Sequence, residues 1–261
     1  YSTVFGTLRI INFAHGTVYA FGSFMSWLAL TSFGWNPLLA VIFSMVLAGL
    51  LNMIIEWFGL RPLRTKQGSG VSAMITTIGL SYIIQNMMDI VFGSEFQHFP
   101  AILNFGSFQI GQYSINTQQI LVTVVALLLM AVLMLIINKT RAGLAMQAVA
   151  QNSKAAAITG IRVNQTISFT FMLAGMTAAI AGTFIGGYYQ MLSPAMGSLT
   201  GLKAFSAAVL GGVGSVPGSI LGGLAIGFAE VFGTALLGGG YTDSIPFVIL
   251  FIVLLVRPTG F

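Results

Sequence analysis

The chain contains no cysteine, which excludes disulfide bonds, thiolate metal sites and cysteine nucleophiles. No plausible catalytic triad accompanies its two histidines, His15 and His98, and it lacks a zinc-binding His-Glu-x-x-His sequence. The glycine-rich run at residues 211–218 lacks the lysine of a phosphate-binding loop. We therefore expect no catalytic residue, metal or cofactor in this chain, and no ATP hydrolysis by the chain itself.

Charge is also scarce, because only 6% of the 261 residues are charged whereas 56% are hydrophobic. The mean hydropathy is +0.94, which is typical of proteins whose solvent is a lipid bilayer. Since a spanning helix takes about 20 residues, roughly eight to ten hydrophobic segments would fit. The composition predicts an all-α polytopic membrane protein with a single transmembrane domain over residues 1–261. The net charge of +5 lies mainly in loops, so we expect no nucleic-acid partner.

Basic residues predict which loops face the cytoplasm. They gather in residues 61–66, after the hydrophobic residues 37–60, and in residues 138–166, and Arg257 follows the last hydrophobic run. All three places fit one topology with a cytoplasmic C-terminus. Pro62 predicts that the helix over residues 37–60 ends near residue 60. Residues 1–8 look like the end of a hydrophobic segment, so we expect the N-terminal helix to be truncated.

A broken or re-entrant element is predicted within residues 193–243, because residues 204–210 are too short to span and lead into a glycine-rich break. Irregular backbone at membrane depth needs protein or water to satisfy its polar groups, which predicts that this turn lies in the bundle interior. The glycines of the break are Gly211, Gly212, Gly214 and Gly218. Residues 22–29 align weakly with residues 218–225, so an internal repeat is one interpretation of the chain.

Small residues follow one face of two predicted helices, which indicates close helix packing. The first face comprises Gly175, Ala178, Ala179, Gly182 and Gly186. The second comprises Ser219, Gly223, Gly227 and Glu230. Helix packing is favoured over a substrate role for most of these glycines.

Polar side chains share faces in two otherwise apolar segments, and a polar group in lipid needs a partner. The candidate pathway residues are Asn12, His15, Gly16, Tyr19, Ser81, Gln85 and Glu230. His15 could bind substrate, move a proton or only satisfy a buried partner, and Asn12 could pair with backbone freed at Gly16. Glu230 is the acid predicted to lie deepest, whereas Glu56 reads as an anchor near the cytoplasmic interface.

The basic cytoplasmic loop predicts two short helices. Residues 142–150 are strong helix formers, Asn152 or Ser153 can cap a second helix over residues 154–159, and Gly160 can end it in the left-handed conformation. Two interpretations of this loop stay open: a docking element for another protein, or a connector lying on lipid headgroups.

Several motifs together resemble the LivH-type permeases of bacterial branched-chain amino-acid ABC importers. They are Ile-Ile-Asn-Phe-Ala-His-Gly at 10–16, Arg-Pro-Leu-Arg at 61–64, Thr-Thr-Ile-Gly-Leu-Ser at 76–81, the loop at 140–161, and Leu-Gly-Gly-Val-Gly-Ser-Val-Pro-Gly-Ser at 210–219. Their order and spacing cover nearly the whole chain. The chain departs from many members at Thr17, where an acidic residue commonly follows the histidine-glycine pair.

The resemblance implies a permease subunit in the bacterial inner membrane, driven by alternating access. Its partners would be a LivM-like permease, two ATP-binding cassette subunits that use ATP and Mg, and a periplasmic or lipid-anchored binding protein for leucine, isoleucine or valine. Residues 138–166 would form the coupling loop. The coupling residues implied are Gln151, Lys154, Ala156, Ile158 and Gly160.

Three alternatives remain at this stage. Urea and short-amide permeases look similar over the same motifs. A secondary transporter would couple to protons through Glu230 or His15, and a passive channel would carry a small neutral solute without ATP. The docking-like loop favours the ATP-driven interpretation, because neither a secondary transporter nor a channel requires it.

Overall fold

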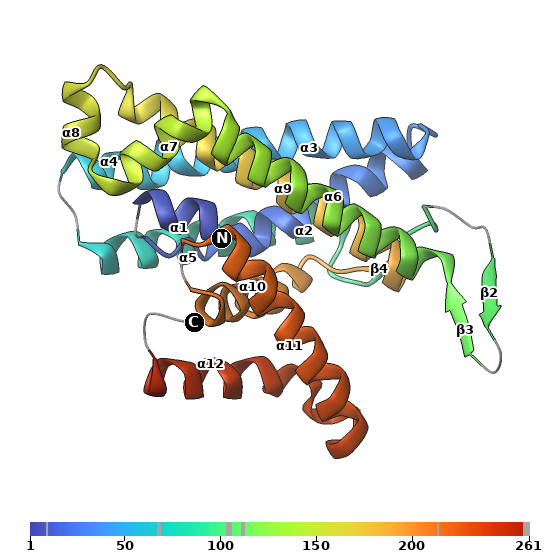
Figure 1. The fold of residues 1–261 in the computed structure, drawn as a ribbon. Coiled ribbons are helices and arrows are strands. Elements are labelled where there is room, and N and C mark those ends of the chain that lie inside the picture. Colours follow the sequence, from blue (N-terminus) through green and yellow to red (C-terminus); the bar gives the residue numbers. More distant parts are fainter. Residues whose placement is uncertain (9, 67–68, 103–105, 111–112, 213, 258–261) are drawn as a thin grey trace.

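The computed structural model describes residues 1–261 except 9, 67–68, 103–105, 111–112, 213 and 258–261 (Figure 1). Most of the described chain is helical, which confirms the all-α polytopic membrane fold. Six helical segments are long and apolar enough to cross a membrane: Pro37–Thr65, Gly70–Phe92, Thr117–Lys139, Val163–Tyr189, Val216–Leu237 and Gly239–Val256. Three further helices accompany them: α1 (Ser2–Leu8), α2 (Ala14–Thr31) and the short apolar helix α10 (Met196–Leu210).

The centre of the bundle is α9 (Val163–Tyr189), which packs against α2 and α3 (Pro37–Ile54). Small residues on α9 permit this approach: a Cβ on Gly182 would lie 2.5 Å from the carbonyl oxygen of Tyr19, and a Cβ on Gly175 would overlap the carbonyl of Ala48. Asn52 on α3 donates a hydrogen bond of 2.7 Å to the Phe171 carbonyl. The first small-residue face predicted from the sequence is therefore a packing face.

The sequence predicted that the helix beginning at Pro37 ends near residue 60, but this is wrong. The helix continues through a π-helical turn, η1 (Ile55–Leu60), into α4 (Arg61–Thr65). Pro62 stands at the start of α4, where a missing N–H costs no intrahelical hydrogen bond. The π turn resets the helical register immediately before the proline.

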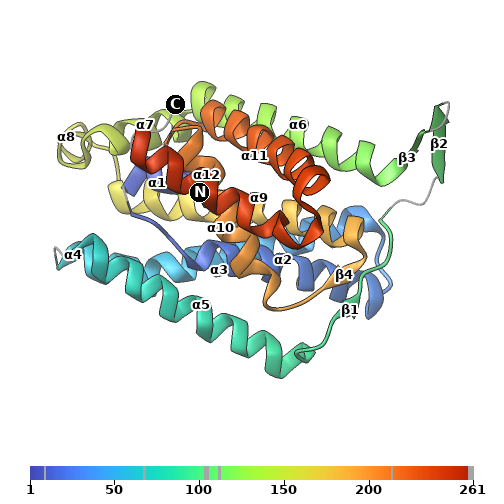
Figure 2. The same cartoon turned by 90° about the horizontal axis from the view of Figure 1, so that it is seen from below.

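The next two spanning helices are α5 (Gly70–Phe92) and α6 (Thr117–Lys139), and the residues between them form short strands. Strand β1 (Gln97–His98) pairs antiparallel with β4 (Met191–Leu192), and β2 (Ser107–Ile110) pairs with β3 (Tyr113–Asn116). These strands lie at one end of the bundle, and α4, α7 and α8 lie at the other (Figures 1 and 2). The C-terminal end of α12 (Ile245–Val256) lies at the same end as α8 (Figure 1).

The basic loop folds as its residues predict. It forms α7 (Arg141–Gln151) and α8 (Ser153–Ile158). The Asn152 side chain accepts hydrogen bonds of 3.0 Å from the backbone N–H groups of Lys154 and Ala155, so Asn152 rather than Ser153 is the cap. Gly160 follows with a φ of 87°, in the left-handed region.

The glycine-rich break joins α10 to α11 (Val216–Leu237), which pack against each other. The two backbones touch at Gly211 and Gly218, where a side chain on either residue would overlap the other's carbonyl oxygen. The turn itself lies beside α1, because the Gly214 N–H donates to the Ser2 hydroxyl at 3.1 Å. Gly214 and Ser215 are exposed in this chain, so the prediction of a turn inside the bundle is wrong.

The second predicted packing face is also wrong. A Cβ on Gly223 or Gly227 would have no neighbour within 4 Å, whereas one on Gly222 would overlap the carbonyl oxygen of Ala207. The face of α11 that meets α10 is therefore rotated by one residue from the predicted stripe.

Adjacent glycines on α11 give a matched test of this packing. We expect Gly222→Ala to destabilise the chain by about 1–3 kcal/mol, because the methyl group overlaps α10 backbone. Gly223→Ala should leave stability unchanged or raise it by up to about 1 kcal/mol through helix propensity. The midpoint of thermal unfolding in detergent measures both. Equal midpoints for the two variants would contradict the α10–α11 contact.

Candidate functional site

A cavity of about 880 Å³ opens between the helices of the described chain. Its walls come from α1, α2, α6, α9, α10 and α11, so segments far apart in sequence meet around it. The size falls within the range of small-molecule sites. Most of the wall is apolar, including Leu129 and Leu133 on α6 and Ile185 on α9.

Four of the seven candidate pathway residues line this cavity: His15, Gly16, Tyr19 and Glu230. The other three lie elsewhere. Asn12 borders a smaller pocket beside α1, Ser81 shares a hydrogen bond with Thr17, and Gln85 lies partly buried on α5. The polar face of α5 is therefore turned toward α2 rather than toward the cavity, as the hydrogen bond from the Phe13 N–H to Thr77 also indicates.

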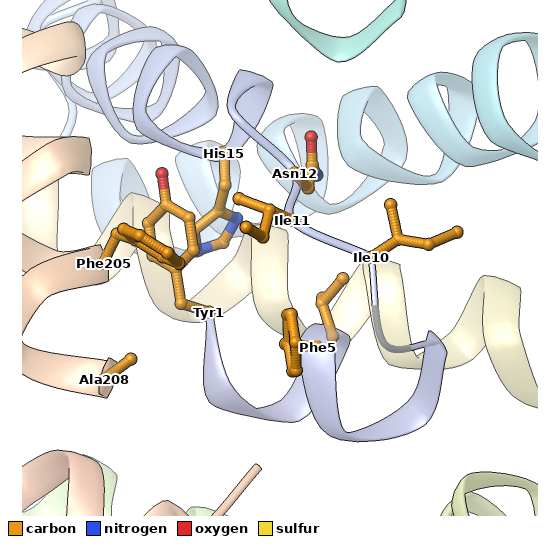
Figure 3. A pocket seen from close by; sticks show the side chains of 9 residues that line it. Tyr1, Phe5, Ile10, Ile11, Asn12, His15, Phe205 and Ala208 are labelled. Atoms are coloured by element: carbon orange, nitrogen blue, oxygen red, sulfur yellow. The ribbon is translucent and has the colours of Figure 1, made fainter. Parts of the chain in front are cut away.

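Asn12 and His15 sit at the break between α1 and α2 (Figure 3). Asn12 accepts a hydrogen bond of 3.1 Å from the Ala14 N–H, so it stabilises the start of α2 rather than backbone at Gly16, as the sequence suggested. The His15 ring packs edge-on against Tyr1, with 4.8 Å between ring centroids. Asn12 Nδ2 and His15 Nδ1 are buried without a hydrogen-bond partner among the described residues.

Gly16 is the point where α2 and α10 touch. A side chain on Gly16 would overlap the Gly197 carbonyl, and a Cβ on Gly201 would lie 2.9 Å from the Gly16 Cα. The glycine after His15 therefore allows α10 to approach α2 and brings the two helices together at the cavity wall.

An ionic cluster stands at the edge of the cavity. Lys203 Nζ on α10 lies 2.8 Å from Glu230 Oε1 on α11 and 2.8 Å from Asp243 Oδ1. Asp243 belongs to the 3₁₀ helix η2 (Gly239–Ser244). Glu230 is thus an ion-paired carboxylate, which the sequence could not show because its partner is 27 residues away.

Glu56 is the most completely buried acid of the described residues, whereas the Glu230 side chain is 22% exposed; that Glu230 lies deepest in the membrane stays a prediction. Its carboxylate accepts hydrogen bonds from Arg64 at 3.1 Å and from Ser168 at 2.7 Å, and its side chain is 0% exposed. The interpretation as an interfacial anchor missed these partners. The π turn η1, which the sequence did not reveal, carries Glu56 to face α9.

The coupling residues implied by the resemblance lie at the end of the molecule that carries α8 (Figure 1). Ile158 is 88% exposed, whereas Ala156 is buried. Ala156 belongs to an apolar cluster with Val149 on α7 and with Ile167 and Phe171 on α9. Gln151, Lys154 and Gly160 are exposed.

A metal site needs a group of ligating side chains close together. Within the described ranges, no group of three His, Asp or Glu side chains could hold a metal ion. The arrangement offers an apolar cavity with a few polar groups and one ionic cluster, which suits binding and passage of a small molecule.

Comparisons with known proteins agree along the whole chain. A family model described as branched-chain amino acid transport system / permease component matches residues 2–254. The whole chain aligns at 36% identity with the high-affinity branched-chain amino acid transport system permease protein LivH of Escherichia coli K12, and at 39% with BraD of Pseudomonas aeruginosa, covering 88% of each relative. A probable branched-chain amino acid transport permease of Methanocaldococcus jannaschii is 28% identical over 97% of the chain and 83% of that relative. No solved structure matches the chain.

Proposed function

The chain belongs to the family of permease components of branched-chain amino acid transport systems, and from this membership we propose that it forms a transmembrane path for leucine, isoleucine and valine in an ATP-driven importer. The urea, channel and proton-coupled alternatives are not favoured, because the full-length relatives carry the branched-chain description. Selectivity would come mainly from a binding protein outside the membrane.

The cavity is the observation that carries the proposal. Its volume of about 880 Å³ exceeds what one branched-chain amino acid needs, and its wall is largely apolar. Apolar side chains of the cargo would meet residues such as Leu129 and Ile185, while the few polar groups would meet the charged part of the cargo.

The coupling loop would receive the mechanical input. Two ATP-binding cassette subunits, which use ATP and Mg, would dock on α8 through its exposed face around Ile158. Because Ala156 packs with Ile167 and Phe171, a movement of α8 would move the start of α9. The same helix carries Thr177 and Ala181, which line the cavity, so the movement would change the cavity's access.

The complete transporter would contain a LivM-like permease beside this chain and a periplasmic or lipid-anchored binding protein. We place it in the bacterial inner membrane, with α4, α7, α8 and the C-terminal end of α12 on the cytoplasmic side. The basic residues of 61–66 and 138–166 support this orientation. The chain itself would have no enzymatic activity.

Affinity purification in mild detergent tests the assembly. A tagged chain expressed with its native partners should co-purify with cassette ATPases and a second permease. If the chain purifies without partners and takes up leucine when a pH gradient is imposed, the proposal is contradicted. The same preparation gives the material for the transport measurements below.

A further inference from the structure

We propose that Lys203 and Glu230 form a subsite for the zwitterionic head group of an amino acid at the edge of the cavity. The cargo's α-ammonium would bind the Glu230 carboxylate, and its α-carboxylate would bind the Lys203 ammonium. The inference rests on the proposed function and adds to it the residues that contact the cargo.

The placement of the two side chains is the first support. Both line the cavity, one from α10 and one from α11, and no other Asp, Glu, Lys or Arg of the described chain does. The side chains of Lys203 and Glu230 are 24% and 22% exposed, so each is partly buried in the wall and still accessible to a ligand. Asp243, which is 61% exposed, holds Lys203 without lining the cavity.

The charge balance is the second support. One lysine lies between two carboxylates, so the negative charges of the cluster outnumber its single positive charge. A charge at an apolar wall is costly unless it is paired. An incoming ammonium would supply the missing positive charge, and Asp243 would keep Lys203 in place while the cargo's carboxylate approaches it.

The hydrogen bonding of Glu230 is the third support. Its Oε1 atom lies 2.8 Å from Lys203 Nζ, so the carboxylate is already paired on one side. A carboxylate has about four lone-pair sites, so Glu230 can accept further hydrogen bonds. The cargo's ammonium has three donors and could bind the carboxylate beside Lys203.

The spacing of the charges also matches the cargo. The ammonium and carboxylate of an amino acid are separated by one carbon atom, and Lys203 and Glu230 present opposite charges side by side at 2.8 Å. A zwitterion can therefore pair with both at once, in reversed order. Its side chain would extend toward the apolar α6 wall, where Leu129, Met130 and Leu133 lie.

Glu230→Gln and Lys203→Met test the subsite in the complete transporter, reconstituted with its ATPases and binding protein. Each should lower the maximal rate of ATP-driven leucine uptake by about tenfold or more, the loss expected for one charge-assisted hydrogen bond. The KM should change little, because the binding protein captures the cargo. Glu230→Asp should recover part of the rate, and Asp89→Asn, on α5 away from the cavity, is the matched control.

The double variant Lys203→Met/Glu230→Gln separates binding from structure. If the pair only holds α10 to α11, removing both charges should restore the uptake lost in the single variants. The subsite predicts that the double variant transports no faster than either single one, while assembly and ATPase activity match the wild type. Restored uptake, or wild-type uptake in Glu230→Gln, would overturn the subsite.

The same head-group chemistry occurs in zwitterionic lipids, so the vesicle composition is varied. The loss in Glu230→Gln should persist in phosphatidylglycerol vesicles, which lack an ammonium group. A loss confined to phosphatidylethanolamine vesicles would assign the pair to lipid and overturn the inference. Failure of the wild-type complex to take up leucine would instead contradict the proposed function, so the two failures are distinguishable.

Discussion

Replacing Ile158 with glutamate is expected to abolish binding of the cassette ATPases and, with it, all ATP-driven uptake. Ile158 is 88% exposed on α8, so it contributes almost nothing to the packing of this chain. A docked ATPase would bury this exposed apolar side chain, so we expect Ile158 to contribute to the contact. A charge at the centre of such a contact would leave an unpaired group in a dry interface.

The matched control is Ile158→Leu, which keeps the apolar surface and should keep ATPase binding. Ala156→Glu is not informative, because Ala156 is buried against α9 and the charge would disrupt the permease itself. Co-purification and the unfolding midpoint of the permease are measured together. An Ile158→Glu chain that retains its ATPases would show that α8 is not the docking element.

Removing the carboxylate of Glu56 should cause the largest loss of stability from a single charge. Glu56→Ala leaves Arg64 without its buried partner and leaves the Ser168 hydroxyl without an acceptor. Breaking a buried ion pair costs about 3–5 kcal/mol, and the low end applies because Arg64 is 22% exposed and can reach water. The midpoint of thermal unfolding in detergent measures the loss.

Two controls accompany Glu56→Ala. Glu95→Gln neutralises an exposed acid between α5 and α6 and should leave the midpoint unchanged. The double variant Glu56→Met/Arg64→Met removes both charges and should regain much of the lost stability. If Glu56→Ala unfolds at the wild-type midpoint, the buried network does not hold η1 to α9.

Local features of this fold could be predicted from the sequence because their causes are local. Asn152 begins α8 through a hydrogen bond to a neighbouring residue, and Gly160 follows the helix with its own positive φ. The spanning helices follow from runs of apolar residues, and the face of α9 with Gly175 and Gly182 follows from helical spacing. Each of these predictions needs no knowledge of a distant partner.

Features set by distant partners could not be predicted. The π turn before Pro62 carries Glu56 to face Ser168, 112 residues away in sequence. The rotation of α11 that selects Gly222 over Gly223 depends on where α10 lies. For the same reason, the sequence suggested Ser81 and Gln85 as pathway residues, although neither lines the cavity, and it missed Lys203 as the partner of Glu230.

Uptake of labelled leucine and labelled urea into proteoliposomes tests the central claim most directly. The vesicles contain this chain with its co-purifying subunits and binding protein, with or without ATP on the side of the ATPases. The account predicts leucine accumulation that requires ATP and no accumulation of urea. Leucine uptake without ATP, or accumulation of urea alone, would contradict an ATP-driven permease for branched-chain amino acids.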